Sequence, residues 1–298
     1  MARIGFIGLG NIGGAIVRNL LEDGHDVAVH DVDKARVDAL VKDGAEAAAN
    51  AADVASRGEL TFLSLPTPDV VDAVAAEWLV GAQSGSLLVD LSTNAPARVR
   101  ALAKRVQAAG CQFLDAPLTG GAAGAQARML MFMVGGDPEV FARVEPILDS
   151  IGRATVHMGE VGAGMIGKLV NSCVAFTTTW SSLEALALGS KAGIDLRKLV
   201  DMLRTAGAGN FYIDRMVEGI AKRGAPTQFS LELAAKDAGL ILDLARAHGV
   251  PTPIASAIAQ VLVSAIGSDL GQADWSDLPA LLERQADLRF ELAPADDD

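Results

Sequence analysis

The stretch GFIGLGNIGGAIVRNL, residues 5–20, decides the fold. It contains G-x-G-x-x-G at Gly8, Gly10 and Gly13, between an apolar strand pattern and an amphipathic helix pattern. In this context Gly8 permits a tight turn, Gly10 lets a pyrophosphate approach the backbone, and Gly13 lets helix and strand pack closely. The helix N-terminus then offers N–H groups and a positive dipole end to the phosphates. The spacing alone also suits a glycine-rich connecting turn, but the flanking strand and helix favour a dinucleotide site.

The next strand pattern, DVAVHD, ends in Asp31, which follows the glycines by about twenty residues. A carboxylate there accepts hydrogen bonds from both hydroxyls of the adenosine ribose and repels a 2′-phosphate, so it favours NAD over NADP. Lys34 and Arg36 follow closely and weaken this preference. Asp31 could instead only cap the next helix, but its place at a strand end favours ribose binding.

The chain changes character near Val161. Before it, short apolar strand patterns alternate with helical patterns, which is typical of parallel β-α-β units. After it, long helical patterns follow without a convincing strand. We therefore expect an α/β fold: a Rossmann domain with a doubly wound parallel sheet (1–161), joined by a long helix to an all-helical domain (162–292). The active site would lie in the cleft between them, and the acidic residues 293–298 would form a disordered tail.

Composition narrows the function. The net charge of −12 gives no global field that attracts nucleic acid or anionic membranes. No apolar run is long enough to span a bilayer, and glycines and a helix pattern argue against a signal peptide at the start. Cys111 and Cys173 lie far apart, as expected of reduced thiols in a cytoplasmic protein. The four histidines lack metal-ligand spacing, so no metal is expected.

A second glycine-rich stretch, GAGMIGKLVN, spans residues 162–171. It resembles a nucleotide-phosphate loop, but that loop needs Ser or Thr after its lysine, and Leu169 stands there. Lys168 is instead a lone charge at the start of an apolar helix pattern. A first-turn position would lower its pKa and suit it to acid/base work. A solvated surface lysine is the alternative. Asn171, three residues on, shares its helical face.

Four motifs in register resemble the β-hydroxyacid dehydrogenase family, which includes 3-hydroxyisobutyrate dehydrogenases and tartronate semialdehyde reductases. The likeness covers nearly the whole chain. The motifs are GFIGLGNIGG, the substrate-loop-like DAPLTGGAAGA, the catalytic-segment-like GAGMIGKLVN, and KDAGLILDLA, which begins at Lys236.

The resemblance implies an oxidoreductase that moves a hydride between a nicotinamide and a small anionic 3-hydroxy acid or its semialdehyde. It implies Lys168 as the catalytic residue, with Asn171 beside it, and a homodimer or homotetramer formed through the helical domain. Substrate contacts would come from Thr119, Gly120, Gly121 and Asn171. Cofactor contacts would come from Gly8, Gly10, Asn11, Ile12, Gly13, Asp31, Leu65, Pro66, Thr93 and Lys236.

Several positions depart from the family pattern and leave the substrate open. The family usually has Met at or near Asn11 and Ile12, Ser at Thr119, a second Asn at Ser172 and Gly at Arg128. Arg128 is expected at the surface. If it faced the pocket, it would suit a second anionic group such as a sulfonate, phosphate or carboxylate. Tartronate semialdehyde, sulfolactaldehyde and 4-hydroxybutyrate are alternative substrates.

Other functions fit less well. The related 6-phosphogluconate dehydrogenases typically carry His-Asn-Gly after the lysine, where this chain has LVNSCV. Imine reductases on this fold usually lack the lysine. A non-catalytic NAD-binding scaffold is a further alternative, and the retained Lys168, Asn171 and Thr119 argue against it.

Overall fold

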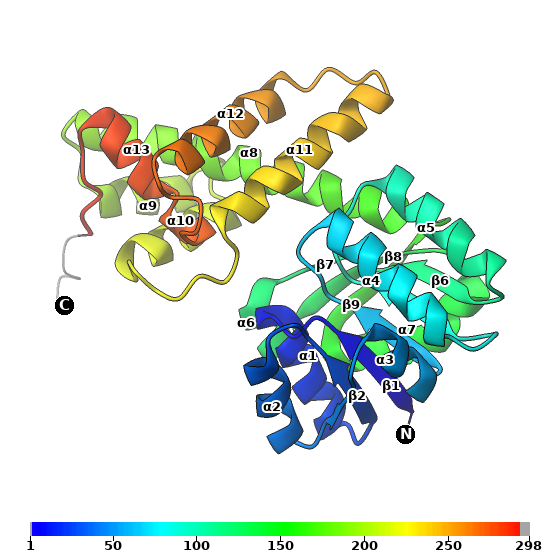
Figure 1. Ribbon diagram of the computed structural model, residues 1–298. Helices are drawn as coiled ribbons and strands as arrows, with labels where there is room; N and C mark the ends of the chain where they lie inside the picture. Colours follow the sequence, from blue (N-terminus) through cyan, green and yellow to red (C-terminus); the bar gives the residue numbers. More distant parts are fainter. Residues whose placement is uncertain (1, 293–298) are drawn as a thin grey trace. The chain divides into compact units, whose positions relative to one another are not determined.

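A computed structural model describes residues 2–292 (Figure 1). The chain divides into two compact units, the first ending at Leu169 and the second beginning at Val170. One long helix, α8 (Ala163–Lys191), crosses this division. The boundary expected from the sequence, 161/162, lies just before the start of α8. The expected disordered tail, 293–298, lies outside the described residues.

Within the described residues, the first unit contains a nine-stranded sheet of order β3-β2-β1-β4-β5-β6-β8-β7, with β9 paired to β8. The strands are β1 (Arg3–Ile7), β2 (Asp26–His30), β3 (Glu46–Ala47), β4 (Leu60–Leu63), β5 (Leu87–Asp90), β6 (Gln112–Asp115), β7 (Leu118–Thr119), β8 (Leu130–Gly135) and β9 (Gly152–Gly159).

The first six strands in sheet order, β3-β2-β1-β4-β5-β6, all pair in parallel, which confirms the doubly wound Rossmann core. β8, however, runs antiparallel to both β6 and β7. A parallel pairing needs a crossover of a dozen or more residues, usually a helix across the sheet. The 14-residue link from β6 to β8 is long enough, but its six-residue helix α6 (Gly121–Gln126) spans only about 9 Å. Its two-residue strand β7 already pairs antiparallel with β8. The chain therefore reverses direction there.

Helices cover both faces of the sheet (Figure 1). One apolar core joins the strands to α1 (Asn11–Glu22), α2 (Lys34–Lys42), α6 and α7 (Pro138–Ile151). The other joins them to α3 (Ala51–Arg57), α4 (Pro68–Gly81) and α5 (Pro96–Ala108). Strand residues alternate between the cores, as Phe6 and Ile7 do on β1.

Among the described residues of the second unit, all regular secondary structure is helical apart from one isolated bridge between Ser230 and Asp274, as the sequence predicts. Side chains of Asp195, Asn210 and Ser230 cap three of its helices. Besides the rest of α8, the helices are α9 (Leu196–Thr205), α10 (Phe211–Ala221), α11 (Leu231–Ala247), α12 (Pro253–Gly267), the 3₁₀ turn η1 (Trp275–Asp277) and α13 (Pro279–Ala286). In the part of the chain that the structure describes, none of the helices is apolar over a length that could cross a membrane.

Candidate functional site

The glycine loop between β1 and α1 is built so that only glycine fits at two positions. Gly8 has φ +96°, and a Cβ there would overlap the carbonyl of Ser64. A Cβ on Gly13 would overlap the carbonyl of Gly8, so α1 packs directly on the end of β1. These are the turn and the close packing that a dinucleotide loop requires.

Gly10 differs, because it faces open space. It precedes α1 as its N-cap, and a Cβ there would meet only Nη1 of Arg36, at 3.8 Å. Among the described residues, the first turn of α1 contains no acidic side chain. Asn11 and Ile12 are its first two helical residues. A pyrophosphate therefore fits at this helix end, where backbone N–H groups and the helix dipole favour an anion.

Asp31 ties the end of β2 to the glycine loop. Its Oδ2 accepts the N–H of Leu9 at 2.6 Å, and its Oδ1 accepts the N–H of Asp33 at 2.8 Å. The cap of α2 is Asp33, whose carboxylate accepts the N–H of Ala35. The alternative that Asp31 only caps the next helix is therefore wrong. Each carboxylate oxygen of Asp31 keeps a second lone pair for a ribose hydroxyl. Nη1 of Arg36 lies 3.9 Å from Oδ2 of Asp31.

Leu65, Pro66 and Thr93, the other cofactor candidates of this unit, follow β4 and β5 at the carboxyl edge of the sheet. The N–H of Leu65 donates to Oγ of Ser92 at 2.9 Å, which fastens one loop to the other. Asp90 in turn accepts the N–H of Ser92 at 2.9 Å. Because β1, β4 and β5 are parallel, these loops share an edge with the glycine loop. Ligands of open α/β sheets bind at this edge.

The substrate-loop candidates lie at the turn from β7 into α6. Thr119 ends β7 and pairs with Met131 of β8. Gly120 and Gly121 follow with φ values of +127° and +64°, a conformation that favours glycine. A Cβ on Gly121 would meet nothing within 4 Å, so its backbone faces open space. The expected loop is thus a turn that starts a short helix.

Lys168 lies in the second turn of α8, because that helix begins at Ala163. The expectation that Lys168 lies in the first turn is therefore wrong by one turn. Because the influence of the helix dipole fades after the first turn, the dipole acts on Lys168 less than expected. Two N–H groups at the start of α8, those of Gly162 just before it and of Met165 in its first turn, already have an acceptor. They donate to the carboxylate of Asp115, at 2.7 and 2.9 Å.

That carboxylate also argues against a nucleotide-phosphate loop at residues 162–168, because a phosphate would have to occupy the same place. The residue after the lysine, Leu169, is buried and cannot hold a metal ion. Burial raises the pKa of Asp115 to about 6, against the opposing effect of its backbone hydrogen bonds and the charge of Arg100. Asp115 begins the substrate-loop-like stretch DAPLTGGAAGA but was not among the residues expected at the site. The available signal was an acidic residue at a strand end, just before the substrate-like turn.

Asn171 and Lys236, the two candidates in the second unit, lie on different helices. Asn171 follows Lys168 by three residues on α8 and is half-buried. Lys236 lies on α11, with its Nζ 3.1 Å from Oδ1 of Asp237. Its side chain is 22% exposed, so it is not the fully solvated lysine that a surface position would give.

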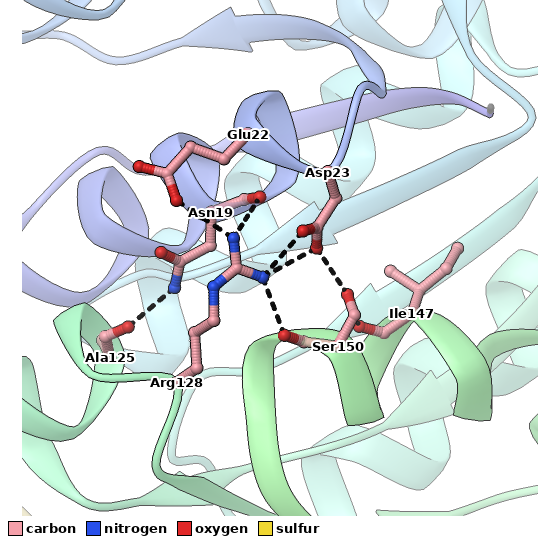
Figure 2. Close-up of polar contacts among 7 residues, drawn as sticks. All are labelled: Asn19, Glu22, Asp23, Ala125, Arg128, Ile147 and Ser150. Atoms are coloured by element: carbon pink, nitrogen blue, oxygen red, sulfur yellow. Dashed lines mark hydrogen bonds and ion pairs between the residues drawn. The ribbon is translucent and has the colours of Figure 1, made fainter.

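Arg128 is bound by the chain itself rather than offered to a substrate (Figure 2). Its Nη1 donates to Asp23 and to the carbonyl of Ser150, at 2.8 and 2.9 Å, and its Nη2 donates to the carbonyl of Asn19 and to Glu22, both at 3.1 Å. The hydrogen bonds from Arg128 contribute most to lowering the pKa of Asp23. Ser150 lies in the last turn of α7, and Asn19, Glu22 and Asp23 lie at the C-terminal end of α1. A helix of this length, 12 residues, puts them about 18 Å from the glycine loop.

Within residues 2–292, no group of three or more His, Cys, Asp or Glu side chains is arranged to hold a metal ion.

Comparison with known proteins covers both units. Residues 3–159 match the family model described as the NAD binding domain of 6-phosphogluconate dehydrogenase. Residues 162–282 match the model described as the NAD-binding of NADP-dependent 3-hydroxyisobutyrate dehydrogenase.

Similar proteins span nearly the full chain. A 3-hydroxyisobutyrate dehydrogenase of Pseudomonas aeruginosa is 36% identical over 274 residues, 89% of this chain and 92% of the relative. A 3-sulfolactaldehyde reductase of Escherichia coli K12 is 33% identical over 289 residues, 95% and 96% of the two chains. The solved structure of Mycobacterium tuberculosis 3-hydroxyisobutyrate dehydrogenase with L-serine has a TM-score of 0.87 at 28% identity, covering 95% of this chain and 99% of that one.

Proposed function

The chain belongs to the β-hydroxyacid dehydrogenase family, whose members bind NAD-type cofactors, and we propose that it interconverts a small 3-hydroxy acid resembling 3-hydroxyisobutyrate with its semialdehyde, using NAD. The observation that carries this proposal is the position of Lys168. Its helix starts against Asp115 at the carboxyl end of β6, at the same sheet edge as the glycine loop after β1.

The bound nicotinamide supplies or accepts the hydride. In reduction, Lys168 Nζ polarises the carbonyl oxygen of the semialdehyde and gives it a proton as negative charge develops there. In oxidation, neutral Nζ takes the proton of the hydroxyl group. The Asn171 amide holds the reacting end of the substrate. Thr119 and the backbone of Gly120 and Gly121 hold its carboxylate, because positive-φ glycines can turn N–H groups toward an anion.

NAD is the proposed cofactor because Asp31 follows β2 directly, where a carboxylate would repel a 2′-phosphate. Its side chain is only 8% exposed and is fixed by backbone N–H groups, so it cannot easily turn away from that phosphate. Arg36 is near enough to offset part of this repulsion. We therefore propose a preference for NAD rather than strict exclusion of NADP, with Lys236 at the nicotinamide end.

The environment of Arg128 favours a substrate with a single anionic group. Its guanidinium is engaged by Asp23, Glu22 and backbone carbonyls away from the glycine loop, so it is not available for a second one. The match of the second half to a 3-hydroxyisobutyrate dehydrogenase model further supports this substrate over 6-phosphogluconate. We also propose a cytoplasmic homodimer or homotetramer formed through the helical unit, without nucleic-acid or membrane partners.

A substrate panel tests the reaction. Purified protein is assayed by NADH and NADPH absorbance with 3-hydroxyisobutyrate, L-serine, tartronate semialdehyde, sulfolactaldehyde, 4-hydroxybutyrate and 6-phosphogluconate. We expect the highest kcat/KM with 3-hydroxyisobutyrate and NAD. A clear preference for 6-phosphogluconate would contradict the single-anion proposal, and a clear preference for sulfolactaldehyde would contradict a carboxylate substrate. NADH binding without turnover of any compound would favour a non-catalytic scaffold.

Lys168→Ala tests the catalytic assignment. Loss of a general acid/base typically costs about 10²–10⁴ in rate, so we expect kcat to fall by at least about 10²-fold. Lys104→Ala, which removes an exposed lysine of α5, is the matched control and should keep wild-type kcat. Turnover of Lys168→Ala within a few-fold of the control would refute the role of Lys168.

A further inference from the structure

Asp115 is a fully buried carboxylate joined to the helix that carries Lys168. It ends β6 and is 0% exposed. Its two oxygens accept the N–H groups of Gly162 and Met165, residues 47 and 50 positions later in the chain. These donors lie just before and within the first turn of α8, where N–H groups have no partner inside the helix.

Glycines make room for this carboxylate. A Cβ on Gly135 would stand 2.6 Å from Oδ1 of Asp115, and a Cβ on Gly164 would stand 2.9 Å from Oδ2. Gly162 has φ +90°, which turns the chain into α8 and aims its N–H at Oδ1. The glycines of the GAG segment thus bring the helix start against β6 and β8.

Stability alone does not account for an ionised carboxylate here. Burial is the main cause of its pKa of about 6. An unfolded aspartate has a pKa of about 3.9. Because the pKa is higher in the folded chain, this group favours folding when protonated, and that contribution is lost as pH rises through about 6. At neutral pH the charged form is kept although it costs stability, which points to a requirement other than folding.

We propose that Asp115 is a positioning residue for Lys168: its carboxylate fixes the first turn of α8 to the end of β6 and so sets where the lysine ammonium reaches. Lys168 follows Met165, one of the two donors, by three residues, which is less than one helical turn. The inference rests on the proposed role of Lys168. It assigns Asp115 no contact with substrate or cofactor.

The elements packed around Asp115 contribute few charged groups in the described residues. Arg100 on α5 lowers the pKa of Asp115 through its charge, and its Nε also donates to the Val161 carbonyl at 3.2 Å. Asp90 is the neighbouring residue on β5. On β8 the facing residue is a glycine, and the next charged residue along α8 is Lys168.

Asp115→Asn is the direct test. Its amide oxygen can accept one of the two N–H groups, but its NH₂ group can accept neither, so the helix start loses a hydrogen bond at nearly unchanged volume. A small misplacement of a reacting group can cost about 10²-fold in rate. We expect kcat to fall about 10- to 100-fold while the NADH dissociation constant stays within about twofold of wild type, because the phosphates bind at α1.

Asp137→Asn is the matched control. Asp137 also caps a helix of this unit, accepting the N–H groups of Glu139 and Val140 at 2.8 and 3.3 Å, but α7 carries no candidate site residue. Both N–H groups donate to the same oxygen, Oδ1, which an Asn amide oxygen can replace, so this variant should keep its cap and leave kcat within about twofold of wild type. Equal losses of kcat in the two variants would overturn the positioning role.

The pH profile of reduction separates Asp115 from Lys168. Reduction needs a protonated lysine, so a loss of kcat on the acid side cannot come from Lys168. Protonated Asp115 turns one acceptor into a donor, so wild-type kcat should fall as pH drops through about 6. Arg100→Gln should move this fall to higher pH, because the charge that lowers the pKa of Asp115 is gone, whereas Arg100→Lys should not.

The outcomes distinguish failure of the proposed function from failure of the positioning role of Asp115. If Lys168→Ala keeps its turnover, the proposed function fails. If Lys168→Ala is inactive but Asp115→Asn binds NADH and turns over within twofold of wild type, only the positioning role is overturned. Should Asp115→Asn not fold, the pH profile decides: an acid limb that shifts in Arg100→Gln supports the role, and a flat profile or an unmoved limb overturns it.

Discussion

The starts of α1 and α8 are two glycine-rich helix N-termini in one unit, and they differ in what meets their N–H groups. At α1, Gly10 leaves open space, and the first turn has no acidic side chain among the described residues. At α8, the carboxylate of Asp115 accepts the N–H groups of Gly162 and Met165. One end is therefore suited to an external anion, while the other is already closed by an internal one.

The difference teaches that glycine spacing before a helix does not identify a phosphate site. Glycine makes a close approach feasible, but the approaching group can be a ligand or another part of the chain. Gly8 and Gly13 bring α1 against β1, and Gly162 and Gly164 bring α8 against β6. Only the first pair leaves a neighbouring glycine facing open space, so only that helix end remains a candidate for the dinucleotide.

Closing the open end should have the largest effect. Gly10→Asp places a carboxylate at the N-cap of α1, a favourable cap that should raise the free energy of unfolding by up to about 1 kcal/mol. The same charge repels the pyrophosphate, so we expect NADH affinity to fall by about 10²-fold or more. Calorimetry measures both quantities. Gly10→Ala, which adds bulk without charge, should weaken binding less, and equal losses in the two variants would contradict the electrostatic account.

The ribose end of the same site should respond more weakly. Asp31→Ala removes the carboxylate that repels a 2′-phosphate while Arg36 remains nearby, so the ratio of kcat/KM for NAD over NADP should narrow by about tenfold. The control is Asp33→Ala, which removes the α2 cap but no cofactor contact. The account would be wrong if Asp31→Ala left the ratio unchanged or if Asp33→Ala narrowed it equally.

The far end of α1 should affect stability alone. Arg128→Ala breaks hydrogen bonds to Asp23, Glu22 and two backbone carbonyls, a loss of about 1–3 kcal/mol in the free energy of unfolding. Arg18→Ala removes an exposed ion pair to Asp43 and should cost less than about 1 kcal/mol. Denaturant unfolding compares them. If Arg128→Ala instead raised the KM for substrate, Arg128 would be a substrate-binding residue.

The sequence predicted what local pattern controls. Apolar alternation and helix signals identified the Rossmann core, the helical second unit and the loop from Gly8 to Gly13, because each depends on neighbouring residues. Short elements such as α3 and α6 were missed because they contain too few periodic positions. The antiparallel direction of β8 was also not predicted, because strand direction depends on the whole connection between strands.

The features that the sequence did not predict depend on contacts between residues far apart in the chain. Asp115 meets partners 47 and 50 residues away, and Arg128 meets Asp23 across 105 residues. No spacing in the sequence indicates either pairing. The role of Asp115, the second-turn place of Lys168 and the engagement of Arg128 therefore required the fold.

The NADH dissociation constant of Lys168→Ala, measured beside its turnover, tests the central claim most directly. If the cofactor phosphates bind at α1 and α8 only delivers the lysine, affinity should stay within about twofold of wild type while kcat falls by at least about 10²-fold. A loss of NADH affinity as large as that in Gly10→Asp would contradict the account, because it would make the lysine of α8 part of the phosphate site.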